Sequence, residues 1–105
     1  MPLIRKPTTQ ELEDHFFGSG AFMWGWFSVA DNASWAHFPT IVVELNEDRE
    51  EISRKEITED MFVEGIKQYA ESLEDRTFDD LIEDMGARDV DAVIQLIMFG
   101  EIKYS

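Results

Sequence analysis

Carboxylates are the most abundant chemical groups in this chain. Of its 105 residues, 23 are acidic and 9 are basic, which gives a formal net charge of −14. In the stretch 75–86, Asp80 and Asp84 are four residues apart and Glu83 lies between them, so a helix would place all three on one face. Oxygen ligands of this kind suit Ca²⁺ or Mg²⁺, but the stretch lacks the alternating ligands and central glycine of an EF-hand loop. We therefore predict a solvated acidic helix face and no metal site.

The residue types that carry most enzyme chemistry are scarce or scattered. The two histidines, His15 and His37, fall in different predicted elements, and neither belongs to an HExxH pattern. The chain has no cysteine, and it contains no GxSxG elbow, phosphate-binding loop or GxGxxG motif. The sequence therefore predicts a non-enzymatic protein without catalytic residues and without a cofactor.

The negative charge is concentrated in the second half of the chain. Residues 44–91 hold 18 acidic and 6 basic residues, whereas residues 1–43 hold four acidic and two basic ones. Nucleic acids and anionic lipids are themselves polyanions, so this charge opposes direct binding to either. The distribution favours a protein partner with a basic surface. A surface that is acidic only for solubility is the alternative.

Carboxylates on helices can imitate the phosphates of a nucleic acid. A DNA duplex carries one charge per about 1.7 Å of axis, and neighbouring turns of a helix place side chains about 5–6 Å apart. We therefore consider an inhibitor that blocks a basic nucleic-acid-binding groove. The candidate partner-binding face comprises Glu71, Glu74, Asp75, Asp79, Asp80, Glu83 and Asp84. A longer track would add Glu56, Glu59, Asp60, Glu64, Asp89 and Asp91.

The second unusual feature is an aromatic segment at residues 21–29. As a strand it would have apolar side chains on both faces, with Trp24 and Trp26 on one and Phe27 on the other. Such a strand is either central and covered on both sides, or buried on one side with an interface on the other. Tryptophan is enriched in binding hot spots. Core packing is the favoured interpretation, and the candidate apolar interface comprises Trp24, Trp26 and Trp35.

Stepwise placement of the elements predicts an α+β fold. Thr8 and Glu11 have the spacing of a capping box, which predicts a helix over Thr9–Phe17. The aromatic segment and the β-branched runs Thr40–Leu45 and Glu51–Ile57 predict an antiparallel meander of about three strands.

Three helices are predicted in the C-terminal half. Thr58, Thr77 and Asp89 are suitable N-caps, and apolar residues recur after each at helical spacing. Gly86 and Gly100 are suitable ends for the second and third of these helices. The last five residues, 101–105, could add an edge strand. Residues 1–105 are thus expected to form one α+β domain, a small antiparallel sheet packed by a short N-terminal helix and three C-terminal helices.

No export or membrane signal is expected. The first twenty residues lack an apolar region behind a basic start. The longest apolar stretches, 21–30 and 90–100, are shorter than the roughly 20 residues of a membrane-spanning helix. Together with the absence of cysteine, this predicts a cytoplasmic protein.

The C-terminal stretch resembles the ending of a known group of proteins. Residues 89–95, DVDAVIQ, followed by residues 99–104, FGEIKY, are similar to the ends of small acidic accessory proteins of actinobacterial phages. The resemblance implies a viral origin and a role in the cytoplasm of an infected host, and it implies no site residues. Two functions remain open at this stage. One is an inhibitor or adaptor that binds a host protein through the acidic face, and the other is a structural, homo-oligomeric accessory protein with a Trp-rich interface.

Overall fold

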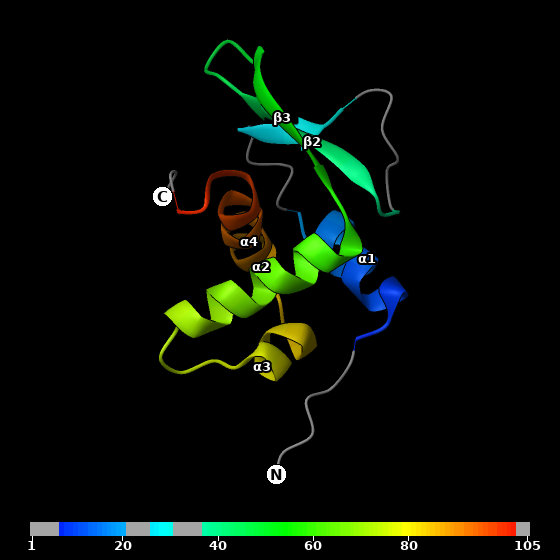
Figure 1. Cartoon of the computed structure of the whole chain (residues 1–105), viewed down its shortest axis with the longest axis vertical. Helices are drawn as coiled ribbons and strands as arrows, with labels where there is room; N and C mark the ends of the chain where they lie inside the picture. The colour runs from blue at the N-terminus through cyan, green and yellow to red at the C-terminus, as the bar shows by residue number, and fades with distance from the viewer. Residues whose placement is uncertain (1–6, 21–25, 31–36, 103–105) are drawn as a thin grey trace.

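The computed structural model describes residues 7–20, 26–30 and 37–102 and confirms the α+β class (Figure 1). One small antiparallel sheet lies above a layer of helices. The elements in chain order are α1 (Thr9–Gly18), β1 (Phe27–Val29), β2 (Thr40–Leu45), β3 (Glu51–Ile57), α2 (Glu59–Ser72), α3 (Phe78–Glu83) and α4 (Ala87–Phe99).

The sheet is an antiparallel meander in the order β1-β2-β3. β2 is therefore the central strand, and Val42 on its inner face is fully buried. This order is the predicted meander. Of the two alternatives for the aromatic segment, the central strand is wrong, because β1 is short among the described residues and lies at an edge of the sheet. Residues 21–25 lie outside the described part.

Side-chain caps fix the starts of three helices where the sequence predicts them. The Thr8 hydroxyl accepts from the amide of Glu11, and the Glu11 carboxylate accepts from the amide of Thr8. Thr58 caps α2, and Thr77 forms a second capping box with Asp80 at the start of α3. These caps satisfy amides that have no partner inside a helix.

Two boundaries in the C-terminal part differ from the prediction. α4 begins at Ala87, with Gly86 as its N-cap, so Asp89 is the third helical residue and not the cap. Its carboxylate accepts a 3.1 Å hydrogen bond from the Gly86 amide, which is the second half of a capping box. The predicted terminal strand is wrong for Glu101 and Ile102, which belong to no strand, and residues 103–105 lie outside the described part.

The core lies between the sheet and the helices and is centred on aromatic rings. Phe16 of α1 is fully buried and contacts Phe17, Phe38 and Phe62 edge-on, with centroid distances of 4.8–5.0 Å. Below it, α2 packs against α4 at a point where Gly65 has no side chain to separate the helices. The β2–β3 hairpin projects beyond this core, at the end of the molecule opposite α3 (Figure 1). Among the described residues, no helix is long and apolar enough to cross a membrane.

Candidate functional site

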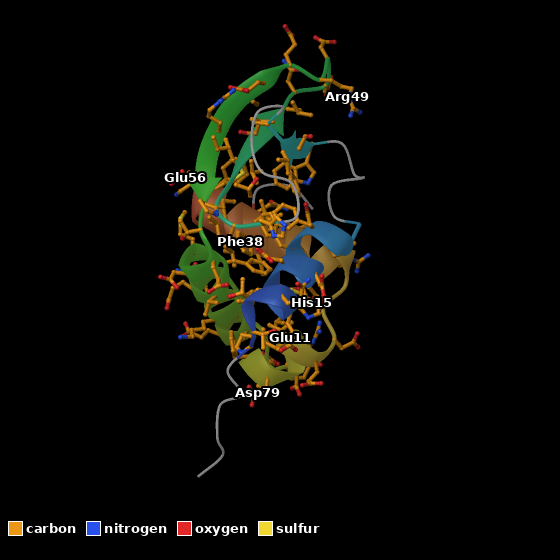
Figure 2. The ribbon with its side chains drawn as sticks, turned by 90° about the vertical axis from the view of Figure 1, so that its right-hand side faces the viewer. Glu11, His15, Phe38, Arg49, Glu56 and Asp79 are labelled. Carbon is orange, nitrogen blue, oxygen red and sulfur yellow. The ribbon has the colours of Figure 1, made fainter. Side chains whose placement is uncertain are left out.

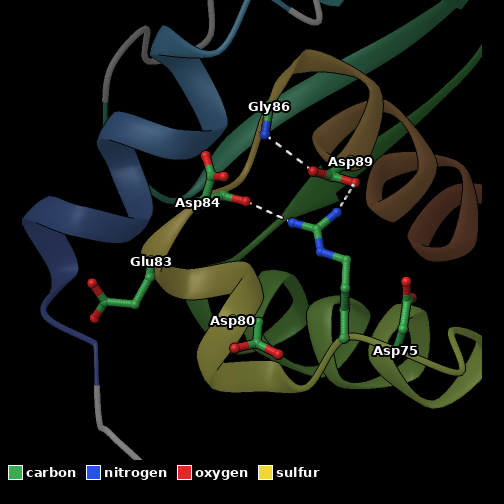
Figure 3. Close-up of a pocket in the computed structure, with 7 residues that line it drawn as sticks. Asp75, Asp80, Glu83, Asp84, Gly86 and Asp89 are labelled. Atoms are coloured by element: carbon green, nitrogen blue, oxygen red, sulfur yellow. Dashed lines mark hydrogen bonds and ion pairs between the residues drawn. The ribbon is translucent and has the colours of Figure 1, made fainter.

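An open, acidic hollow of about 630 Å³ lies where α2, α3 and α4 meet (Figure 3). Its walls come from the α2–α3 connection, α3 itself and the turn into α4. The lining residues, called the acidic hollow below, are Asp75, Arg76, Asp80, Glu83, Asp84, Gly86 and Asp89. Three separate segments therefore supply its carboxylates.

Arg76 and Asp89 both line the acidic hollow and are bonded to each other (Figure 3). Arg76 Nη1 lies 3.0 Å from Asp89 Oδ1, and Nη2 donates a 2.6 Å hydrogen bond to the carbonyl oxygen of Asp84. The Tyr69 hydroxyl donates to the same Asp89 oxygen at 3.0 Å. Burial, followed by the interaction with Asp89, raises the pKa of Tyr69. Arg76 and Asp89 thus tie the three segments together, and their charges are used inside the fold.

The predicted acidic face divides into two groups. Asp75, Asp80, Glu83 and Asp84 line the hollow, whereas Glu71, Glu74 and Asp79 lie outside its lining. Glu71 and Glu74 are exposed at the C-terminal end of α2, and Asp79 is half-buried on α3. Asp80 has a structural role as well, because its carboxylate accepts from the Thr77 amide at 3.0 Å.

Several of these carboxylates lie where a helix tolerates negative charge poorly. Glu71 is in the last turn of α2, Glu83 is the last residue of α3, and Asp84 is its C-cap. Neither helix has a basic residue in its last turn. A carboxylate at the negative end of the helix dipole is unfavourable by about 0.3–1 kcal/mol, whereas at the other end it is stabilising. Folding stability alone does not explain this placement.

The longer predicted track is wrong at its C-terminal end. Asp91 is buried, with 7% of its surface exposed, and it accepts hydrogen bonds from Trp26 Nε1 at 2.6 Å and Gln95 Nε2 at 2.9 Å. Asp89 is bonded to Tyr69 and Arg76 within the fold. Neither carboxylate can be presented to a partner as a free phosphate mimic.

Trp26, one of the three tryptophans of the candidate apolar interface, packs against the core. Its ring is half-buried against the core, beside Phe27 and Phe99, and its indole nitrogen bonds Asp91 of α4. Much of this side chain is therefore already in contact with the protein. Trp24 and Trp35, the other candidates for an apolar interface, lie outside the described residues.

The buried Asp91 makes stability depend on pH. Burial raises its pKa, although the hydrogen bonds from Gln95 and Trp26 act in the opposite direction. The folded state therefore holds this proton more tightly than the unfolded chain does. Protonated Asp91 favours folding below the ordinary aspartate pKa, and that contribution is lost as pH rises through the raised folded value.

We expect Asp91→Asn to gain stability relative to the parent protein as pH rises from about 3 to about 7. Asparagine stays neutral over this interval and can still accept from Trp26. Urea unfolding at a series of pH values measures the difference in free energy of unfolding. Asp48→Asn, which removes an exposed carboxylate in the β2–β3 turn, away from any helix end, is the control. A difference that stays constant with pH for Asp91→Asn would contradict the argument.

The histidines connect elements. His15 Nε2 lies 2.8 Å from the carbonyl oxygen of Ile82, which joins α1 to α3. His37 is exposed, and its Nδ1 lies 3.4 Å from a carboxylate oxygen of Glu13. Within the described ranges 7–20, 26–30 and 37–102, no group of three or more histidine, aspartate and glutamate residues is arranged to hold a metal ion.

Sequence reasoning missed the two residues that organise the acidic hollow. Arg76 carries a signal that could have found it, because it stands among the carboxylates of residues 71–89, where Arg88 is the only other basic residue. An arginine among so many carboxylates is a natural partner for one of them. Tyr69 carries no comparable signal, since its spacing also fits an apolar helix face.

Comparisons with known proteins give no further assignment. No protein-family model, curated protein or solved structure matches the chain.

Proposed function

We propose that the protein is a non-enzymatic binding protein that engages a basic surface of a partner protein through the acidic hollow and the adjoining end of α2. One observation carries the proposal: five carboxylates line one hollow, and Arg76, the sole basic residue of its lining, is already bonded to one of them, Asp89. A basic side chain from a partner would therefore meet several acceptors and little competition.

The electrostatics of the surrounding segment support this. Residues 71–89 contain eight acidic and two basic residues, a net charge of −6. A concentrated field of one sign steers an oppositely charged partner and makes association depend strongly on salt. The partner surface that we name is a basic groove that normally binds nucleic-acid phosphates. The protein would inhibit such a partner by occupying the groove in place of the nucleic acid.

The position of the acids supports binding over solubility alone. Carboxylates that serve only solubility could stand at helix N-termini, where they also stabilise the fold. Asp79 and Asp80 do stand in the first turn of α3, but Glu71, Glu83 and Asp84 stand at C-terminal ends. Residues that lower the stability of the fold are expected where they serve a function such as binding.

The proposal predicts that reversing two exposed charges beside the acidic hollow abolishes partner capture. Glu74 and Asp75 are exposed, and we expect Glu74→Lys/Asp75→Lys to lose the partner while remaining folded. The experiment presents immobilised protein to the heparin-binding fraction of an actinobacterial lysate, the source that the resemblance to phage proteins suggests. We expect capture at about 0.05 M salt and release near 1 M, where the Debye length falls to about 3 Å.

The chain offers a matched control for this variant. Glu47 and Asp48 form the same dipeptide, are equally exposed, and lie in the β2–β3 turn at the other end of the molecule. Glu47→Lys/Asp48→Lys changes the net charge by the same amount and is expected to keep the partner. Equal loss in both variants would show a response to total charge only. Capture that survives both the reversal and high salt would overturn the proposal.

A further inference from the structure

The outer edge of β3 is open in the described structure. β3 is the last strand in the order β1-β2-β3, and its residues 51–56 are all exposed (Figure 2). An edge strand presents a row of backbone donors and acceptors that can pair with another chain. Because the hairpin projects from the helices, this edge is accessible along most of its length (Figures 1 and 2).

The charge of this strand sets it apart from the rest of the molecule. Residues 49–56 hold three acidic and three basic residues, so the segment is neutral in a chain of net charge −14. Elsewhere, two copies of the chain would repel each other. Here they can approach without that repulsion.

The order of the charges is complementary to itself. On the N-terminal side of Ser53 stand Glu50 and Glu51, and on the C-terminal side stand Arg54 and Lys55. Antiparallel pairing of two β3 strands about Ser53 would set the acidic half of each copy against the basic half of the other. Opposite charges across a strand pair are stabilising.

Opposite charges can meet across the paired strands only if their side chains project from the same face of the sheet. An irregularity in β3 produces this arrangement. The β2–β3 register shifts where Glu51 pairs with Leu45 and Ser53 pairs with Glu44, so Ile52 is an extra residue. As a result Glu51 and Arg54 lie on the same face, where they form an ion pair and line one hollow. In the paired strands, Arg54 of one copy then faces Glu51 of the other on that face. Lys55 faces Glu50 on the opposite face, where its Nζ donates a 3.0 Å hydrogen bond to the carbonyl oxygen of Ile97 within its own copy.

Other symmetric registers are less favourable. A two-fold axis normal to the sheet sets one residue opposite itself. Centring the pair on Arg54 or Lys55 brings like charges together at the axis, and centring it on Ile52 uses the irregular residue. We propose that the protein forms a two-fold symmetric dimer by antiparallel pairing of β3 with β3 of a second copy, centred on Ser53, which yields a continuous six-stranded sheet.

The dimer is separate from the proposed binding function. The β2–β3 hairpin and α3 lie at opposite ends of the molecule, so pairing at β3 leaves both acidic hollows open (Figure 1). Loss of one property therefore does not entail loss of the other. The alternative is that the exposed charges of β3 prevent strand pairing, as charges on edge strands often do. That alternative predicts a protein that is strictly monomeric.

The first test is a pair of charge reversals examined alone and mixed. We expect Glu50→Lys/Glu51→Lys and Arg54→Glu/Lys55→Glu each to weaken self-association at least about tenfold, because acid then faces acid or base faces base. Mixed in equal amounts they should form a heterodimer, since positions 50, 51, 54 and 55 are all basic in one variant and all acidic in the other. Sedimentation velocity to about 1 mM protein measures the masses, and circular dichroism confirms that each variant is folded.

The second test does not depend on reversed charges. The chain has no cysteine, so Ser53→Cys introduces a single thiol. Residues opposite each other in an antiparallel pair have Cα atoms about 4.5–5.5 Å apart, within the range that a disulfide spans. We expect rapid oxidation to a cross-linked dimer, while Ser72→Cys on α2 stays largely monomeric. A parent protein that is monomeric throughout, reversals that leave a dimer unchanged, or equal cross-linking at both sites would each overturn the proposal.

Discussion

Phe16→Ala is expected to lower the free energy of unfolding by about 3–5 kcal/mol, a large part of the 5–15 kcal/mol typical of a domain this size. Phe16 is fully buried and contacts three other rings edge-on. Its loss removes both the buried ring and the edge-on pairs that the ring makes, and it leaves a cavity in the core. Urea unfolding followed by circular dichroism measures the change.

Two further substitutions show whether position or residue type causes the loss. Phe16→Leu retains most of the volume and should cost clearly less than alanine. Phe78→Ala removes the same side chain from the start of α3, where it is only half-buried, and should also cost less. If all three variants unfold at the same urea concentration, Phe16 is not the centre of the core.

Gly65→Ala is the second substitution with a large expected effect, although alanine is the better helix former. A Cβ atom at residue 65 would lie 2.9 Å from Val93 Cγ1 and 2.9 Å from Ile97 Cγ1. Both neighbours are β-branched and have little rotamer freedom in a helix. Overpacking of about 1–3 kcal/mol should therefore exceed the gain in helix propensity of about 1 kcal/mol.

Gly18 provides the matched control for Gly65. It is the last residue of α1, and a Cβ atom there meets nothing within 4 Å. Gly18→Ala should therefore be neutral or slightly stabilising, while Gly65→Ala lowers the thermal midpoint. Parallel thermal unfolding of the two variants checks this. Equal stabilisation in both would mean that α2 and α4 can separate at little cost.

The sequence predicted those parts of the fold that local interactions determine. Thr8, Thr58 and Thr77 each cap a helix through a hydroxyl that reaches an amide three residues away, so the signal lies within one turn. The strands at 40–45 and 51–57 were likewise identified by their own residues. At Asp89 the local signal was ambiguous, because aspartate serves both as a cap and as the third residue of a capping box.

Features that depend on distant partners were not predictable. Asp91 is buried where α4 packs near Trp26, whose indole nitrogen donates to its carboxylate from 65 positions away along the chain. The contact of His15 with the carbonyl oxygen of Ile82 likewise joins residues 67 positions apart. For the site, the sequence supplied the carboxylates of the acidic hollow. It could not show that Asp75 and Asp84 would meet around Arg76, because that requires the packing of α2 against α4.

The long contacts of α1 have a consequence during synthesis. The imidazole of His15 reaches the carbonyl of Ile82, 67 residues later in the chain, and a ribosome adding about 5–20 residues per second needs roughly 3–13 seconds to make that distance. Phe16 also packs on Phe62 of α2, so α1 reaches its final environment only after α2 and α3 have been synthesised. Until then the two adjacent rings of Phe16 and Phe17 lack most of their native cover, which favours aggregation of the incomplete chain.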